Sequence, residues 1–349
     1  MIENEIYIIV PHKDNHEIVE QFISFSDEIL QKYLFVYFII IDDHSSDGTT
    51  LRLKEKFVHQ SRVIFLNNKN VGVSGARNTG LRYVYNLTDL KNKWIIFCDF
   101  DDVVSPNIFS NFFNATILKK FDYVLFGFTS NEDRFRQCNI EHNIVSIKKS
   151  PFTDYYSKIL GGTFMYGGIN YNLNAPWAKI INVDFLNKNK IFFNENLTFK
   201  EDLVFNLEIL KSSPNIGMLC NIYYYYYLNP NSTVRNYIQN INEQNEIVFE
   251  ELEVLIPQNK SDLIKLFLVK SLVETVFLYI FSSNKKTTYI GSYRKFKEIT
   301  SQVSIYRSIL TSMYFSKSIK RKYMIIYILV KLKCFNILFL LMKLRKYRK

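Results

Sequence analysis

The sequence predicts an α/β domain built on a doubly wound, mostly parallel sheet, followed by an all-helical region. Over the first hundred residues, short apolar runs alternate with segments whose apolar residues recur at helical spacing. Each run ends in polar residues, and an open parallel sheet gathers such ends at one edge. From about residue 240 only helical spacing remains, so we expect a boundary near 238.

The predicted elements follow in a regular order. In the first hundred residues, strands are predicted at 6–10, 34–41, 63–66 and 94–98, and helices at 16–32, from Thr49, and after the loop 70–80 through Tyr85. Further on, strands are predicted at 123–128 and 222–228, and helices at 106–120, from Lys200, at 240–256, 260–282, 290–310 and from 317. Residues 130–150 are interpreted as irregular, and 161–178 as a glycine-rich loop.

Charge is unevenly spread along the 349 residues. The last acidic residue is Glu298, and twelve lysines and arginines follow it, one more than the net charge of +11. A nearly neutral body with a basic tail predicts a surface that the tail contacts. Binding of nucleic acid is disfavoured, because the lysines and arginines cluster beside apolar runs instead of spreading over a folded face.

The tail from residue 317 alternates apolar runs with basic residues. The runs, 323–330 and 334–342, are far shorter than the about 20 residues that a membrane span requires. We expect an amphipathic helix on an anionic membrane surface. A helix packed on the body is the alternative, and the tail could equally pair with a second copy in a homo-oligomer.

The four cysteines and the N-terminus predict a cytoplasmic protein. The cysteines lie far apart without metal-type spacing, which favours reduced thiols. The first five residues carry two acids and no basic region, so we expect no signal peptide.

The acids after the run 94–98 form the first candidate site. Asp99 and Asp101 are two residues apart and point to the same side of an extended segment. Two converging carboxylates repel each other unless a cation lies between them, and Mg²⁺ or Mn²⁺ holding a diphosphate suits oxygen ligands. A solvated acidic turn is the alternative, but the convergence of other polar strand ends favours a ligand site.

Three further segments leave two interpretations open. The loop 161–178, with Trp177, suits a lid or an acceptor platform, or is a packed connection. Glu201 and Asp202 begin a helix and are either capping residues or a catalytic pair. Arg235 either holds phosphate oxygens or is a surface arginine.

Five motifs in order give residues 1 to about 235 a resemblance to glycosyltransferase family 2, inverting enzymes with the GT-A fold. The motifs are Val10-Pro-His-Lys-Asp-Asn15, Ile40-Ile-Asp-Asp-His-Ser-Ser-Asp-Gly-Thr49, Asn70-Val-Gly-Val-Ser-Gly-Ala-Arg-Asn-Thr-Gly80, Asp99-Phe-Asp-Asp102 and Glu201-Asp202. Two departures stand out: His44 replaces the family's usual glycine, and His12-Lys13-Asp14 is an unusual filling of the first turn. The resemblance divides the chain into 1–238, with a nucleotide-binding half 1–105 and an acceptor half 106–238, and the helical region 239–349.

The resemblance implies a role for each motif residue. On the donor side, Asp43 would accept a hydrogen bond from the uracil imide, and Pro11 and Asn15 would line the base and ribose. Gly72 would let the backbone approach the nucleotide, and Arg77 and Arg235 would bind the diphosphate. Asp99 and Asp101 would contact the ribose and Mn²⁺ or Mg²⁺. On the acceptor side, Asp202 would be the general base, with Glu201, Trp177 and Lys179 near the acceptor.

The function expected from these residues is transfer of a sugar from a UDP-sugar to a hydroxyl of a cell-surface glycan or lipid-linked precursor, such as capsule or lipopolysaccharide. The basic tail suits an enzyme held peripherally on the inner face of the cell membrane. A sugar nucleotidyltransferase is an alternative, although it would need a glycine-rich basic loop where Pro11 to Asn15 lies. The other alternative is a non-catalytic protein that binds the membrane surface.

Overall fold

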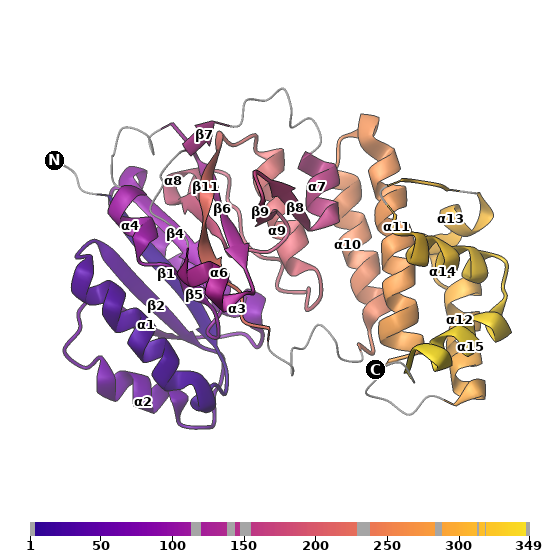
Figure 1. Cartoon of the computed structure of the whole chain (residues 1–349), viewed down its shortest axis with the longest axis horizontal. Coiled ribbons are helices and arrows are strands. Elements are labelled where there is room, and N and C mark those ends of the chain that lie inside the picture. Colours follow the sequence, from indigo (N-terminus) through magenta and orange to yellow (C-terminus); the bar gives the residue numbers. More distant parts are fainter. Residues whose placement is uncertain are drawn as a thin grey trace. The chain divides into compact units, whose positions relative to one another are not determined.

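The computed structural model describes residues 4–112, 120–137, 144–146, 155–228, 238–282, 288–312, 314–317 and 319–346. The chain forms two compact units, Met1–Leu228 and Asn229–Lys349. Figure 1 shows the strands of the first unit and the helices of the second.

A mixed sheet forms the centre of the first unit. Its strand order is β3-β2-β1-β4-β10-β6-β11-β5. The bounds are β1 Glu5–His12, β2 Val36–Asp42, β3 Val63–Asn67, β4 Lys93–Phe97, β5 Val103–Val104, β6 Tyr123–Thr129, β7 Ile144–Ser146, β8 Thr163–Tyr166, β9 Ile169–Asn172, β10 Lys179–Asn182 and β11 Ile216–Tyr225. Strands β3, β2, β1 and β4 are mutually parallel, whereas β10 runs antiparallel to both β4 and β6.

Helices cover both faces of this sheet. The bounds are α1 Val19–Lys32, α2 Thr49–Lys56, α3 Val73–Tyr85, α4 Asn107–Phe112, α6 Glu132–Arg136, α7 Tyr155–Gly161, α8 Val183–Lys188 and α9 Glu201–Lys211, with short 3-10 turns at His16–Ile18 and Leu90–Asn92. On one face, Phe22 of α1 packs edge-on against Phe38 of β2. On the other, Gly80 of α3 faces Ile9 of β1 so closely that an added Cβ would lie 2.6 Å from the Ile9 Cγ2 atom.

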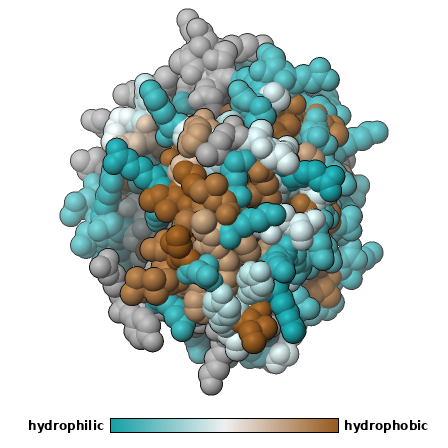
Figure 2. Space-filling view, turned by 90° about the vertical axis from the view of Figure 1, so that its right-hand side faces the viewer, coloured by the Kyte–Doolittle hydropathy of each residue, from teal (hydrophilic) through white to brown (hydrophobic). Residues whose placement is uncertain are grey.

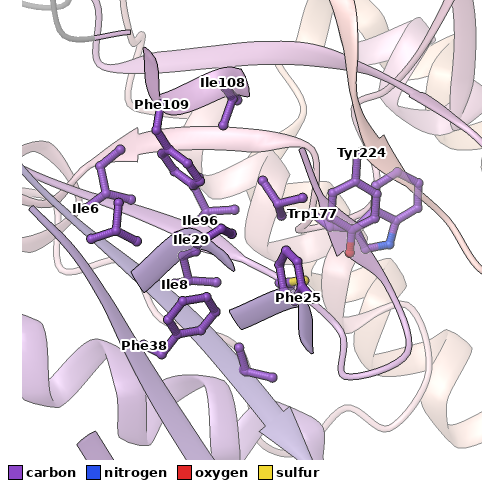
Figure 3. Packing of buried hydrophobic residues seen from close by; sticks show 14 of the residues in the cluster. Ile6, Ile8, Phe25, Ile29, Phe38, Ile96, Ile108, Phe109, Trp177 and Tyr224 are labelled. Carbon is purple, nitrogen blue, oxygen red and sulfur yellow. The ribbon is translucent and has the colours of Figure 1, made fainter. Parts of the chain in front are cut away.

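The alternation of β1 explains how the two faces are filled. Ile6, Ile8 and Val10 belong to one buried cluster with α1 and the first residues of α4. Figure 3 shows Ile6, Ile8 and Ile96 beside Phe38 and Phe109 in this cluster. Because successive strand residues point to opposite faces, Ile9 is left for α3. Burial on both faces is typical of parallel strands, and it explains why these runs are continuously apolar.

The predicted fold class is confirmed, with local corrections. Segment 161–178 contains the hairpin β8–β9 and is not a plain loop. Segment 130–150 contains α6 and β7. Strand β10 and helix α8 were not predicted, because four-residue and six-residue elements are too short to show a period. The described part of the helix expected at 106–120 ends at Phe112, and residues 113–119 lie outside the described residues.

The second unit is helical. Its bounds are α10 Ile241–Leu255, α11 Ser261–Thr275 with a π-turn Val276–Ile280, α12 Tyr289–Ser301, α13 Arg307–Thr311, α14 Arg321–Lys331 and α15 Phe335–Lys346, with 3-10 turns at Gln258–Lys260 and Ser304–Tyr306. Inside it, Asn245 Nδ2 donates to Thr275 Oγ1 at 3.3 Å and to the Tyr306 hydroxyl at 3.1 Å. Within the described ranges, no helix has the length and apolarity to cross a membrane.

The tail is two helices and not one. Helix α14 ends at Lys331, and Lys333 has a left-handed φ of 55° at the start of the turn to α15. Tyr327 and Val330 of α14, and Phe335, Leu338 and Met342 of α15, are buried within the helical unit. The alternative of a tail packed on neighbouring helices therefore holds for one side of each helix.

Candidate active site

The polar ends of β1 and β2 are tied into one edge of the sheet. Pro11 lies in β1 opposite Ile41 of β2, and the Asp43 N–H donates to the His12 carbonyl at 2.9 Å. After β1, the Asn15 N–H donates to Thr49 Oγ1 at 3.1 Å, which fixes this turn to the start of α2. The expected donor residues Pro11, Asn15 and Asp43 are therefore neighbours.

The two departures from the family pattern have structural explanations. His44 adopts a φ of 63°, in the left-handed region where glycine has no steric penalty, which accounts for the family's usual glycine here. Asp14 also has a positive φ, 49°, and its Oδ1 accepts from the Ser46 N–H at 2.7 Å. The unusual turn after β1 thus holds the turn after β2 in place through Asp14 and Ser46.

Asp43 organises the loop that leads into α3. Its Oδ1 accepts from the Gly72 N–H at 3.0 Å and from Asn68 Nδ2 at 2.7 Å. Gly72 has φ 111° and ψ 159°, whereas its missing Cβ would meet no atom within 4 Å. The glycine is therefore required by its backbone conformation and not by a lack of space.

Arg77 joins the acids of two distant segments. Its Nη1 donates to Asp202 Oδ1 at 2.7 Å, and its Nη2 donates to Asp99 Oδ1 at 3.0 Å. Glu201 Oε1 lies 3.8 Å from Nη1, and the guanidinium lies 5.2 Å from the centre of the Phe193 ring. The Arg77 side chain is only 4% exposed, whereas Asp99 and Asp202 keep 34% and 28% exposure. The arginine of this cluster is therefore buried, whereas Asp99 and Asp202 are partly exposed to solvent.

The charges in this cluster shift one another's proton affinity. Burial raises the pKa of the Asp202 carboxyl to about 7; the positive charge of Arg77 opposes this shift, and the charges of Glu201 and Asp99 add to it. Burial would lower the pKa of Arg77, but the three carboxylates raise it above its ordinary value. Arg77 stays charged, and Asp202 gains or loses its proton near neutral pH. A carboxyl with this proton affinity suits a general base.

The three acids after β4 have different environments. Asp102 is buried, its Oδ2 accepts from the Tyr224 hydroxyl at 2.6 Å, and its Oδ1 accepts from the Tyr227 N–H at 2.8 Å. Burial raises the pKa of Asp102 well above its ordinary value. Asp99 and Asp101 are half-buried in the same turn. Asp102 is thus a structural residue, and Asp99 and Asp101 remain the carboxylates that a ligand can reach.

A divalent metal fits this edge only with help from a ligand. One guanidinium faces three carboxyl groups, and Asp101 adds a fourth beside Asp99, so the cluster has excess negative charge. Over the described residues, no group of three or more His, Cys, Asp or Glu side chains is placed to hold a metal ion. Mg²⁺ is commonly held by one or two carboxylates with phosphate and water oxygens, and Asp99 and Asp101 match that pattern.

The expected acceptor residues Trp177 and Lys179 are buried instead of lining an open surface. Trp177 is 7% exposed and stacks on Tyr224 and Tyr226, with ring centres 4.9 and 5.2 Å apart. The Lys179 ammonium is fully buried and donates to the carbonyls of Asn172 at 2.7 Å, Trp177 at 3.1 Å and Ala175. Neither side chain is free to meet an acceptor in this structure, and both hold the segment 172–178.

Lys179 has an unusual environment for a lysine. Burial lowers the pKa of its ammonium to about 7, and the negative charge of Asp202 opposes that shift only in part. Asn206 Nδ2, on α9, donates to the carbonyls of Asn174 at 2.8 Å and Asp202 at 2.9 Å. The segment 172–178 is therefore fastened both to β10 and to the helix that carries Asp202.

Two functional neighbours could not be found from the sequence. Asn206 and Tyr224 carry no motif, and each has a partner far along the chain: Asn174 lies 32 residues from Asn206, and Asp102 lies 122 residues from Tyr224. Asn68 follows a predicted strand, so its place at this edge was signalled by the sequence. Arg235, expected to bind phosphate, lies outside the described residues.

The fold and site together define a class. A mostly parallel sheet with strand-end acids at one edge, joined to a further acid on α9, is the architecture of a GT-A domain. Its likeness to solved structures agrees: the first 349 residues of TarS from S. aureus, solved with UDP-GlcNAc, match with a TM-score of 0.56 and 17% identity, covering 86% of this chain and 81% of that one.

Sequence comparisons point to the same family as the motifs do. Residues 7–172 match the model of glycosyl transferase family 2, the family that the motifs resemble. EpsJ of Bacillus subtilis (strain 168), an uncharacterised glycosyltransferase, is 25% identical over 231 residues, which span 65% of this chain and 62% of EpsJ. Poly(ribitol-phosphate) β-N-acetylglucosaminyltransferase TarP of Staphylococcus aureus (strain N315) is 25% identical over 258 residues, covering 70% of this chain and 72% of TarP.

Proposed function

We propose that the chain transfers a sugar from a UDP-sugar to a hydroxyl of a cell-surface glycan or its lipid-linked precursor, with inversion at the anomeric carbon. The observation that carries this proposal is the cluster in which Arg77 holds both Asp99, after β4, and Asp202, at the start of α9. It joins a group suited to a diphosphate and a group suited to an acceptor hydroxyl in one place. The match to UDP-GlcNAc-bound TarS and to TarP supports a UDP-sugar donor, with UDP-GlcNAc the first to test.

The donor is proposed to lie along the edge formed by β1, β2 and β4. Pro11 and Asn15 flank the base and ribose, and Asp43 accepts from the uracil imide with the lone pairs that Asn68 and Gly72 leave free. Asp99 and Asp101 would hold Mn²⁺ or Mg²⁺, which neutralises the departing diphosphate when bound. Arg77 and Arg235 are assigned to the diphosphate.

Asp202 is proposed to be the general base. Its carboxylate takes the proton from the acceptor hydroxyl as that oxygen bonds to the anomeric carbon and the bond from this carbon to UDP breaks. A single displacement from the opposite face inverts the configuration. Its pKa of about 7 supports the assignment, because a base works best when its proton affinity lies near the working pH. Glu201, 3.8 Å from Arg77, is assigned to the acceptor side.

The acceptor is proposed to be presented at the inner face of the cell membrane, where the chain is held peripherally. The basic composition after Glu298 supports this proposal through attraction to anionic lipids. A sugar nucleotidyltransferase is the second candidate, because enzymes of that class also use paired acids and a metal. It is less well supported, because such an enzyme would need a glycine-rich basic loop after β1, and Pro11 to Asn15 does not provide one.

The test is UDP release from a panel of UDP-sugars, with and without Mn²⁺, for the wild type and for Asp101→Ala. We expect metal-dependent release from one donor, at least about a hundredfold slower in the variant, because the metal loses one of its two protein ligands. Asp262→Ala is the matched control, since this exposed carboxylate pairs with Lys265 at 3.1 Å in the helical unit. Equal release by wild type and Asp101→Ala would contradict the assignment, and release of pyrophosphate in place of UDP would favour the nucleotidyltransferase.

A further inference from the structure

Helix α15 is apolar on both of its sides, although only one side is buried. Its inner side packs into the helical unit through Phe335, Leu338 and Met342, which are 3%, 0% and 8% exposed. Its outer side carries Ile337, Leu340, Leu341 and Leu344, which are 53%, 59%, 40% and 54% exposed. We call these four residues the α15 face. A helix that is apolar all round is ordinarily covered all round, so this face calls for a partner.

The apolar surface continues onto α12. The Tyr289 ring lies 5.3 Å from Phe335 and 5.1 Å from Phe339, and its hydroxyl donates to Asn336 Oδ1 at 2.5 Å. Beside it, Ile290 is 65% exposed. Figure 2, which views the right-hand side of Figure 1, shows a broad area of apolar residues with hydrophilic residues beside it. An area of this kind on one face marks an interaction surface more often than scattered apolar residues do.

Exposed basic residues lie on α15 and on α12, whose Tyr289 contacts it. Lys343 on α15, and Arg294 and Lys297 on α12, are exposed. No acidic residue follows Glu298 in the sequence, so α14 and α15 carry none. Glu298 itself accepts from Asn242 Nδ2 at 3.2 Å and from the Tyr279 hydroxyl at 3.1 Å, inside the helical unit. The surface therefore has an apolar centre with a basic rim.

We propose that the α15 face and its basic rim bind the headgroup layer of an anionic lipid bilayer. This inference rests on the proposed function only in that the acceptor lies at a membrane. The 12 residues of α15 extend about 18 Å, too short to cross a core of about 30 Å, so the helix lies along the surface. Leucines then enter the apolar boundary while lysines and arginines meet lipid phosphates. A second copy on this face would set basic residues opposite basic residues, which disfavours self-association there.

The test is flotation of the full chain with vesicles of phosphatidylcholine alone, or of phosphatidylcholine with phosphatidylglycerol. We expect binding to the anionic vesicles only, weakened by high salt. The double variant Leu340→Asp/Leu344→Asp is expected to bind about thirtyfold more weakly, because two half-exposed leucines no longer leave water. Val254→Asp on α10, at a residue 66% exposed, is the matched control and is expected to bind as the wild type does.

Each result decides the proposal. If the wild type does not float with anionic vesicles, or the double variant floats equally well, the proposal is overturned. If the wild type is a dimer that the double variant breaks, and neither floats, the face pairs copies of the chain instead. UDP release in the absence of vesicles is measured on the same preparations, so that a failure of membrane binding is distinguished from a failure of the transferase.

Discussion

Replacing Arg77 by methionine is the sharpest test of how the acid cluster works. Methionine keeps much of the volume of the side chain but removes the charge that lies 2.7 Å from Asp202 and 3.0 Å from Asp99. Because Arg77 holds down the pKa of the Asp202 carboxyl, its loss is expected to raise that pKa above about 7. Asp202, the proposed base, would then be mostly protonated at neutral pH.

The size of the effect follows from the geometry. A neighbouring arginine lowers a carboxyl pKa by about one to three units, and partial exposure of Asp202 favours the lower end. With a pKa of about 7, roughly half of the Asp202 groups are ionised at pH 7. An increase of one unit leaves roughly one in eleven ionised. We therefore expect the acidic limb of kcat/KM for UDP release to move up by about one pH unit. Ionisation of Asp202 alone then accounts for a fall of about fivefold at pH 7 that is regained by pH 9, on top of a pH-independent loss from the proposed contact of Arg77 with the diphosphate.

The assay is the pH profile of kcat/KM, which reports the free enzyme. Arg82→Met is the control, because Arg82 lies on the same helix, is 53% exposed and pairs with Glu195 at 2.8 Å, away from Asp202. Arg77→Met is also expected to unfold more easily by about 3 kcal/mol, since three carboxylates lose their cation. This deficit should shrink as the pH falls from 7 to 5, because protonation relieves the repulsion. An acidic limb that coincides with that of the wild type would refute the reasoning.

Two further predictions concern packing and the segment 172–178. Gly80→Ala should lower the free energy of unfolding by about 1–2 kcal/mol in urea denaturation, because the new Cβ would lie 2.6 Å from the Ile9 side chain. The control is Gly161→Ala, where nothing lies within 4 Å of the new Cβ and the change should be less than about 0.5 kcal/mol. Equal effects of the two substitutions would contradict the packing argument. The Lys179 pKa of about 7 lies below its ordinary value, so the unfolded chain binds the proton more tightly and wild-type stability should rise above pH 7, by up to about 2 kcal/mol at pH 9. Lys179→Met should lose that rise, and parallel pH profiles of stability for the two proteins would show that Lys179 does not titrate there.

The donor edge could be predicted because its residues lie within short segments that each carry their own signal. Asp43 and Asp99 follow buried strands by one or two positions, and the period of the strands marks where they end. The helix start at Glu201 was visible in the same way. The class of the GT-A fold follows from these alternating elements, because strands that alternate with helices build a mostly parallel sheet.

The acceptor side could not be predicted because long-range contacts decide it. Trp177 and Lys179 had the chemistry for an acceptor, but Tyr224 and Asn206 surround the segment that carries them. No local pattern reports that a lysine will donate to three carbonyls. Likewise, the apolar spacing of the tail predicted helices correctly, whereas which side is buried depends on contacts such as that between Phe335 and Tyr293, 5.2 Å apart.

The direction of β10 has a consequence for how such an enzyme can change. Because β10 runs against β4, its first residue, Lys179, lies near the edge where β4 ends. The chain thus enters the sheet from the reactive edge at β10, while β1, β2 and β4 leave the sheet there. Residues added to the exposed turn of the hairpin β8–β9, at Gly167 and Gly168, would enlarge that edge without shifting the pairing of β1, β2 and β4. Acceptor preference could then diverge by insertion while the donor strands keep their alignment.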